Sequence, residues 1–205
     1  MVPESNLPDD APLVARAQTG DLEAFDELVR RHQRTVYNVA YRVVGDTHEA
    51  SDVAQEVFVR AYRALGKFRG QAKFSTWLYH IAVNTAKNHL RSWSRQHRLQ
   101  TVSLEGPADE EAEEERPVVQ VADPSASPRE AAGSRDVAEQ VQAALQELPV
   151  TYRTVLVLRD LQGLSYEEVA AIVRAPLGTV KAHIHRGRLL LREALRAKGW
   201  SGGML

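Results

Sequence analysis

Apolar side chains recur every three or four positions along most of this chain, which is the spacing of one buried face of an α-helix. No segment shows the apolar–polar alternation of a half-buried strand bounded by hairpin turns. Glycine and proline divide the helical pattern into separate elements. We therefore predict an all-α protein. The expected helices cover residues 12–19, 21–44, 46–65, 75 to beyond 90, 134–148, 151–161, 165–173 and 179–197.

Several of these helix ends carry capping residues. Gly45 follows the second expected helix, where a left-handed glycine cap is favourable. Asp46 with Glu49, and Ser165 with Glu168, have the spacing of capping boxes. The last two expected helices are joined by a short turn containing proline and glycine, which is typical of a helix-turn-helix. A plain antiparallel pair of helices has the same punctuation, so both interpretations stay open at this point.

The net charge of −1 for the 205 residues is a cancellation between segments. Residues 1–104 carry +3, residues 105–133 carry −7, and residues 134–205 carry +3. Like charges repel and prolines favour extended backbone, so the middle segment is expected to be an acidic flexible linker between two small helical domains. It is either a solvated spacer or an acidic strand that occupies a basic channel.

Composition excludes several classes of protein. The chain contains no cysteine, so it has no disulfide, no cysteine zinc site and no thiol nucleophile. No apolar run reaches the roughly 20 residues that span a bilayer, and the acidic N-terminus lacks the apolar core of a signal peptide. No catalytic triad or carboxylate pair is identifiable. We expect a cytoplasmic protein without direct membrane insertion, with no cofactor, no metal and no enzymatic activity.

The stretch from residue 57 to residue 104 contains no acid in 48 positions, but nine bases and seven of the 13 aromatic side chains. Cations neutralise phosphates and aromatic rings stack on unpaired bases, so this composition favours single-stranded nucleic acid as a ligand. The alternative is core packing, which we expect for Phe58, Tyr62 and Trp77. The loop at 66–74 combines two glycines with bases and rings, and it could hold a flipped base.

Two further charged surfaces are predicted. Residues 169–192 contain five bases and no acid, and Lys181, His185 and Arg188 share one helical face. This pattern favours a recognition helix in the major groove of DNA, although a solvated basic face is the alternative. Acids at helical spacing between 46 and 56 favour a docking surface for a basic partner, or again a solvated face.

Two motifs resemble the extracytoplasmic-function (group 4) sigma factors of the sigma-70 superfamily. The similarity covers about residues 13–98 and 137–195, with both motifs in the family's order and spacing. The resemblance to region 2 lies in DVAQEVFVRAY at 52–62, FRG at 68–70 and FSTWLYHIAVN at 74–84. The resemblance to region 4 lies in LP at 148–149, RDLQGLSYEEVA at 159–170 and PLGTVK at 176–181.

This resemblance implies a region 2 helical bundle at 1–104, a linker at 105–133 that threads towards the RNA exit channel, and a region 4 helix-turn-helix at 134–205. It also implies a factor that binds core RNA polymerase and directs promoter-specific transcription initiation of a stress or envelope regulon. An anti-sigma factor is the implied regulator, holding the protein at the membrane when inactive. The active factor would be associated with the nucleoid.

The resemblance assigns roles to matching residues. Core polymerase would be bound by Asp52, Gln55 and Glu56. The single-stranded −10 element would be bound and melted by Lys67, Phe68, Arg69, Lys73, Phe74, Tyr79, Asn84, Lys87, Asn88 and Arg91. The duplex −35 element would be read by Thr179, Lys181, His183, His185, Arg186 and Arg188.

Two other functions are compatible with parts of the sequence. The chain could be a helix-turn-helix repressor or activator that never touches polymerase, but a duplex reader does not need the loop of bases and rings at 66–74. It could also be an adaptor that only sequesters a protein partner, but the acid-free stretches argue against that function.

Overall fold

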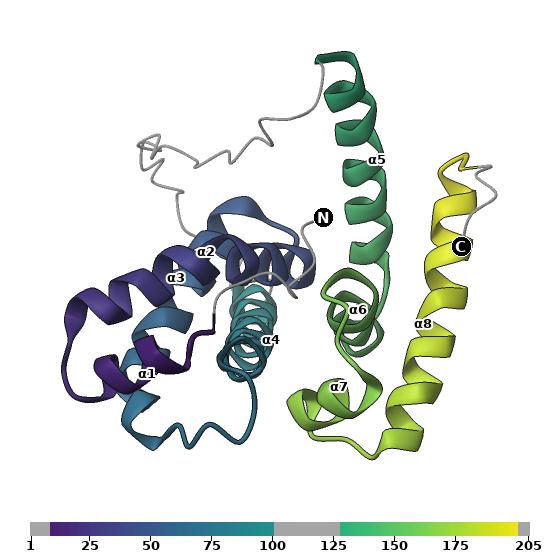
Figure 1. The fold of residues 1–205 in the computed structure, drawn as a ribbon. Coiled ribbons are helices and arrows are strands. Elements are labelled where there is room, and N and C mark those ends of the chain that lie inside the picture. Colours follow the sequence, from purple (N-terminus) through teal and green to yellow (C-terminus); the bar gives the residue numbers. More distant parts are fainter. Residues whose placement is uncertain (1–8, 101–127, 201–205) are drawn as a thin grey trace.

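The computed structural model describes residues 9–100 and 128–200, which contain helices and no strand, as predicted (Figure 1). The first body contains α1 (Ala11–Gln18), α2 (Leu22–Val44), α3 (Thr47–Ala64), the 3-10 turn η2 (Leu65–Lys67) and α4 (Phe74–Gln100). The second body contains α5 (Pro128–Glu147), α6 (Val150–Leu156), the π-helical segment η3 (Val157–Leu161), α7 (Tyr166–Val173) and α8 (Leu177–Ala197).

The first body is a bundle of α2, α3 and α4, with α1 packed against α2. Its core consists of apolar side chains at helical spacing, and Leu28, Val36, Val57 and Leu78 are all fully buried. Burial of these faces is the main stabilising contribution, since each fully buried aliphatic side chain contributes about 1.5–3 kcal/mol. The described charged side chains of α3 and α4 stay outside this core.

Local side-chain chemistry sets the helix boundaries. Ser165 and Glu168 form the predicted capping box at the start of α7, with hydrogen bonds of 3.1 Å and 2.8 Å to the two backbone amides. Asp46 caps α3 by accepting a hydrogen bond from the backbone amide of Glu49 at 2.9 Å. The carboxylate of Glu49 pairs with His89 of α4 and so links α3 to α4. Of the two hydrogen bonds of the predicted capping box, the one accepted by Asp46 is therefore present.

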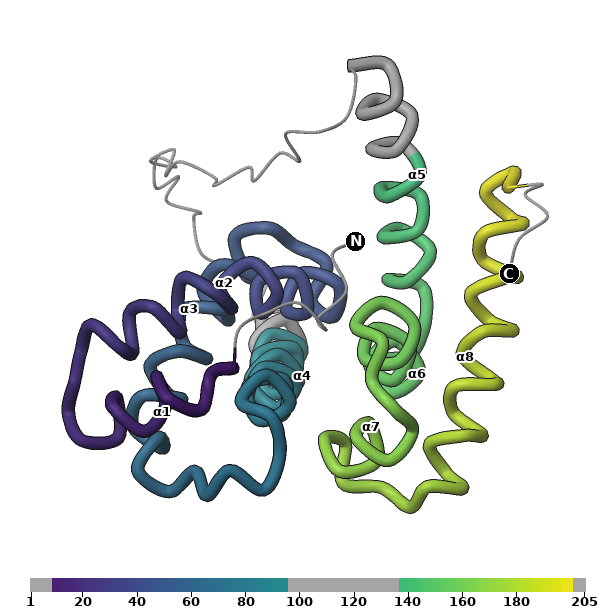
Figure 2. The backbone as a smooth tube through the Cα atoms, viewed as in Figure 1, coloured from purple at the N-terminus to yellow at the C-terminus, as the bar shows by residue number. Residues whose placement is uncertain are grey.

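The second body places α5 alongside α8, with α6 and α7 completing the packing (Figure 2). Gly187 of α8 lies so close to α6 that a Cβ atom there would come within 3.1 Å of the Leu156 side chain. The helix-turn-helix formed by α7 and α8 is held by buried Val169, Ile172 and Ile184. Sequence periodicity did not indicate that η3 is a π-helix.

Helix α5 begins at Pro128, before the expected start at Ser134. The acidic run at 105–115, on which the linker prediction depends, lies outside the described residues. Within 9–100 and 128–200, no helix has both the length and the apolar character needed to cross a membrane.

The two bodies meet at the C-terminus of α2, in a contact that we call the α2 joint. The last carbonyls of a helix lack partners within the helix. Here the amide of Gly45 donates to the carbonyl of Tyr41 at 2.8 Å, and the second body supplies further donors. Gly45 ends α2 with φ of 99°, and a Cβ atom there would lie 2.5 Å from the side chain of Gln146. The carbonyls of Tyr41, Arg42 and Val43 accept hydrogen bonds from Gln142 (2.9 Å), Gln146 (3.1 Å) and Arg153 respectively.

Arg153 is the buried centre of this joint, with 6% of its surface exposed. Its guanidinium also donates to the backbone carbonyls of Gln146 at 2.8 Å and Leu148 at 3.0 Å. Burial lowers the pKa of Arg153 to about 10, so the side chain remains charged at neutral pH. The buried charge is therefore compensated by carbonyl oxygens from both bodies instead of by a carboxylate.

Replacing Arg153 by alanine leaves several buried carbonyls without donors, and we expect the free energy of unfolding to fall by about 2–4 kcal/mol. Urea unfolding followed by circular dichroism measures this loss. Arg196→Ala, which removes an exposed arginine of α8, should stay within about 0.5 kcal/mol of the unmodified chain. A loss below about 1 kcal/mol for Arg153→Ala would contradict the role given to the joint.

Candidate nucleic-acid interface

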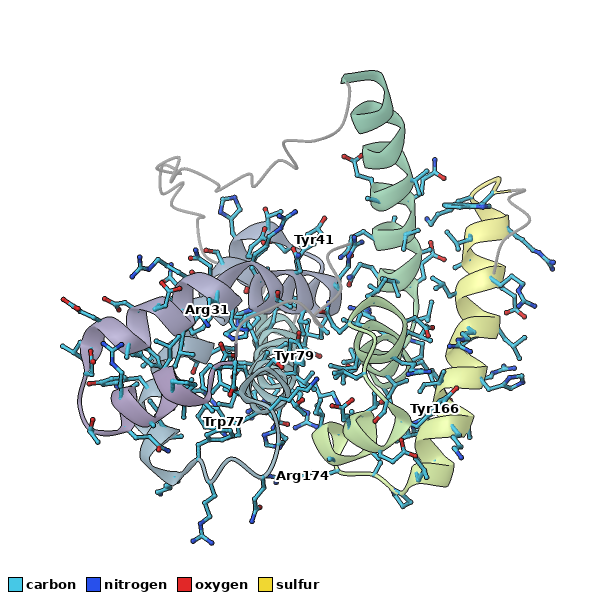
Figure 3. The ribbon with its side chains drawn as sticks, in the orientation of Figure 1. Arg31, Tyr41, Trp77, Tyr79, Tyr166 and Arg174 are labelled. Carbon is cyan, nitrogen blue, oxygen red and sulfur yellow. The ribbon has the colours of Figure 1, made fainter. Side chains whose placement is uncertain are left out.

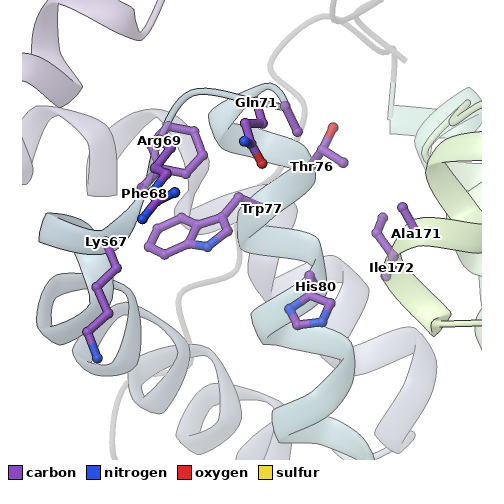
Figure 4. A pocket seen from close by; sticks show the side chains of 10 residues that line it. Lys67, Phe68, Arg69, Gln71, Thr76, Trp77, His80, Ala171 and Ile172 are labelled. Carbon is purple, nitrogen blue, oxygen red and sulfur yellow. The ribbon is translucent and has the colours of Figure 1, made fainter.

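A pocket of about 290 Å³ lies beside the N-terminal half of α4, where the turn after α3 approaches α7 (Figure 4). Basic and aromatic side chains form one side of this pocket, and two aliphatic side chains of α7 form the opposite side. The lining residues are Lys67, Phe68, Arg69, Gln71, Ala72, Thr76, Trp77, His80, Ala171 and Ile172.

Three aromatic rings support the pocket. Phe68, Phe74 and Trp77 form a cluster in which the ring centroids are 5.0–5.9 Å apart. Phe74 is 5% exposed, so it supports the cluster from within the core. Phe68 and Trp77 are half-buried and line the pocket, where a flat ring can stack on a base.

The loop that carries the bases is fixed by a residue that sequence reasoning missed. Gln18 of α1 donates hydrogen bonds to the backbone carbonyls of Leu65 at 2.9 Å and Phe68 at 2.7 Å. Lys67, Arg69 and Lys73 remain exposed around this anchored backbone. Lys67 and Arg69 line the pocket and Lys73 lies in the same loop, so all three can meet phosphates without being buried.

The pocket continues along one face of α4. Asn84, Lys87, Asn88 and Arg91 follow at helical spacing from His80, whose ring lies 3.2 Å from the Nδ2 atom of Asn84. Burial and the charge of Arg91 lower the pKa of Lys87. Burial and the charge of Arg174 lower the pKa of His80, which favours its neutral form. The result is a strip of cations and amides that leads away from the aromatic cluster.

Tyr79 does not share this strip. It is 1% exposed and lies on the core side of α4, from which its hydroxyl donates to the Oε1 atom of Gln162 at 3.5 Å (Figure 3). In this arrangement of the two bodies, the ring of Tyr79 cannot reach a nucleic-acid strand.

The recognition-helix residues of α8 divide into two groups. Thr179, Lys181, His185 and Arg186 are exposed on the N-terminal half of the helix. His183 packs edge-on against the ring of Tyr152, with centroids 5.4 Å apart. Arg188 is bonded to Asp160 through two hydrogen bonds of 2.5 Å and 3.0 Å. His183 and Arg188 thus have partners within their own domain, and Lys181 also lies over the ring of Tyr166, with its Nζ atom 5.8 Å from the centroid.

The acidic face of α3 is exposed as expected at Asp52, Gln55 and Glu56. Glu56 forms an ion pair of 2.6 Å with Arg60 one turn later. Val59 and Tyr62 continue the same helix face with 48% and 46% of their surfaces exposed. Tyr62 was expected in the core, but its ring only reaches the edge of Phe25 (centroids 5.0 Å apart), so the face is partly apolar.

No group of three acidic or histidine side chains in the described parts of the chain is arranged to hold a metal ion.

Comparison with known proteins finds two family models on this chain. The model for sigma-70 region 2 matches residues 28–96, and the model for sigma-70 region 4 matches residues 138–191. The RNA polymerase sigma-H factor of Pseudomonas aeruginosa is 42% identical over 187 residues, covering 91% of this chain and 94% of that protein. The ECF RNA polymerase sigma-E factor of Escherichia coli K12 is 40% identical over 179 residues, covering 87% and 90% respectively.

Among solved structures, CnrH in complex with the cytosolic domain of CnrY is similar, with a TM-score of 0.64 and 26% identity. The match covers 92% of this chain and 97% of that one. The similarity therefore extends over both helical bodies.

The pocket generates a prediction for single-stranded DNA. Lys67→Gln combined with Arg69→Gln removes two charges that line the pocket and should reduce the slope of log affinity against log salt by about 0.7 per lost phosphate contact. Fluorescence anisotropy with a labelled single-stranded oligonucleotide measures this slope. Arg63→Gln, an exposed change on α3 away from the pocket lining, serves as control. Equal slopes for the unmodified chain, the double variant and the control would show that the two cations do not contact the phosphates of the strand.

Proposed function

Since this chain belongs to the extracytoplasmic-function group of the sigma-70 family, we propose that it binds core RNA polymerase and directs it to promoters of a stress or envelope regulon. The observation that carries the proposal is the presence, on one chain, of an aromatic pocket suited to a single unpaired base and a helix-turn-helix with an exposed basic recognition helix. A duplex-binding repressor needs only the second of these. The factor itself would make and break no covalent bond.

The acidic face of α3 is the proposed docking site for core polymerase. Asp52, Gln55 and Glu56 are exposed there, and the apolar side chains of Val59 and Tyr62 extend the face. Acids at the rim of an interface steer a basic partner, while exposed aromatic and aliphatic side chains supply area that is buried on binding. The acids of this face would therefore speed association with a basic partner, and its apolar side chains would stabilise the complex once they are buried.

The pocket and the adjoining strip of α4 are the proposed site for the −10 element. A flipped base would stack on Phe68 or Trp77, while Lys67, Arg69 and Lys73 neutralise neighbouring phosphates. Asn84, Lys87, Asn88 and Arg91 would then follow the strand along α4. A strand that occupies the whole strip needs the space of Ala171 and Ile172, so α7 must move away from α4 when the strand binds.

The N-terminal half of α8 is the proposed reader of the −35 element. Recognition helices contact base edges through residues near their N-termini, and Thr179, Lys181, His185 and Arg186 are exposed in that position. Each good contact to a base contributes about 1–3 kcal/mol of discrimination. His183 and Arg188, which the family resemblance also places here, are bonded or packed within the domain.

An anti-sigma factor is the proposed regulator. CnrH, which resembles this chain over both bodies, is described in complex with the cytosolic domain of CnrY. A partner that covers either the α3 face or the α4 strip would block polymerase or promoter binding. We propose a cytoplasmic location with the nucleoid as the site of action, tethering to the membrane through the anti-sigma factor, and an acidic linker directed to the RNA exit channel.

Charge reversal on α3 tests the proposed docking site. Asp52→Lys combined with Glu56→Lys should abolish co-purification with core polymerase, because two attractive charges become repulsive towards a basic partner. Glu23→Lys combined with Asp26→Lys changes two exposed acids of α2 by the same charge and should leave retention unchanged. If the α3 variant still co-purifies with core polymerase, Asp52 and Glu56 are not part of the docking site. If both variants lose co-purification equally, the effect is due to net charge.

A further inference from the structure

Arg188 of the recognition helix forms a two-pronged contact with Asp160. Its Nε atom donates to one carboxylate oxygen of Asp160 at 3.0 Å, and its Nη2 atom donates to the other at 2.5 Å. This is the fork geometry in which a guanidinium also binds phosphate or the edge of guanine. The hydrogen bonds that Arg188 donates to Asp160 hold the pKa of Arg188 above its ordinary value. The guanidinium of Arg188 is therefore charged, but two of its donors are already hydrogen-bonded to Asp160.

The backbone brings these two residues together in an unusual way. Asp160 lies in η3, a π-helical segment, and such segments occur often at functional sites. Gly187, the residue before Arg188, allows α8 to approach Leu156, the last residue of α6 before η3, without a Cβ atom in between. The pairing of Asp160 with Arg188 thus involves both the π-helical segment η3 and the close approach of α8 at Gly187.

Two other cations of the second body contact the ring of Tyr166. The ring of Tyr166 lies between Arg159, at 4.6 Å from its centroid, and Lys181, at 5.8 Å. The ring holds these two cations without neutralising them. Arg188 is the cation of this group whose charge is met by a carboxylate.

Resting on the function proposed above, we infer that Asp160 is a specificity-determining residue, which withholds Arg188 from the phosphates of DNA. A cation that contacts phosphates strengthens binding to every sequence alike, whereas base contacts discriminate between sequences. With Arg188 occupied, binding to unrelated duplex is kept weak, and the exposed base-facing side chains of α8 determine a larger share of the affinity.

The stability of the domain does not depend on this pair. The Arg188 side chain is 47% exposed and that of Asp160 is 33% exposed, and ion pairs this exposed contribute little to folding. Asp160→Asn keeps the shape of the side chain but removes its charge. The variant should fold as the unmodified chain does while releasing Arg188, so its effect appears in DNA binding.

The test uses holoenzyme assembled from core polymerase and the full chain, with a promoter duplex chosen by the unmodified holoenzyme from a library and a copy with a scrambled −35 element. For Asp160→Asn we expect about three- to tenfold tighter binding to the scrambled duplex and a salt slope steeper by about 0.9, the value for one added phosphate contact. The ratio of promoter to scrambled affinity should fall. In a chain that already carries Arg188→Gln, adding Asp160→Asn should change neither quantity.

Glu193→Gln is the matched control, because it removes one exposed acid from α8 with the same change in net charge. An Asp160→Asn protein that behaves like this control would overturn the inference, as would an effect that persists in the Arg188→Gln background. Failure of the unmodified holoenzyme to distinguish the two duplexes would instead overturn the proposed function, and this inference with it.

Discussion

At the C-terminus of α2, three backbone carbonyls accept hydrogen bonds from Gln142, Gln146 and Arg153 of the second body. A helix end without such donors would bury unsatisfied carbonyls, at a cost of about 1–3 kcal/mol for each group. Because these donors come from α5 and α6, α7 comes to rest against α4 and completes the pocket. The shape of the candidate −10 site in this arrangement therefore depends on a polar contact some distance from it.

The charges of the chain are separated by helix as well as by domain. The acids of α3 and the cations of α4 belong to one bundle, whose shared core keeps the two faces apart. A basic protein partner and a polyanion can thus bind the same small domain without competing. In the second body the separation is finer, since Asp160 neutralises one cation of the recognition face and leaves the others exposed. Because the acidic and basic segments cancel, the net charge of −1 gives no indication of these surfaces.

Local chemistry made much of this fold predictable. The helices were predictable from the spacing of apolar residues, from the glycine after α2 and from the Ser165–Glu168 capping box. The loop beside the pocket was predictable from the family motifs. The buried position of Tyr79 could have been predicted from its helical spacing with Ala82, Val83 and Ala86, whereas the family resemblance assigned it to the −10 set. Contacts such as Gln18 with the loop, and Asp160 with Arg188, join residues far apart in sequence through tertiary packing and a π-turn, so no local pattern indicates them.

Promoter-specific transcription by the assembled enzyme tests the central claim most directly. Purified core polymerase and the full chain would be combined in run-off transcription on a promoter library. We expect discrete transcripts that core polymerase alone does not make, and that disappear when either the −10 or the −35 element is scrambled. An absence of promoter-specific transcripts would contradict it, and duplex binding by the chain without polymerase would then identify a repressor or activator instead.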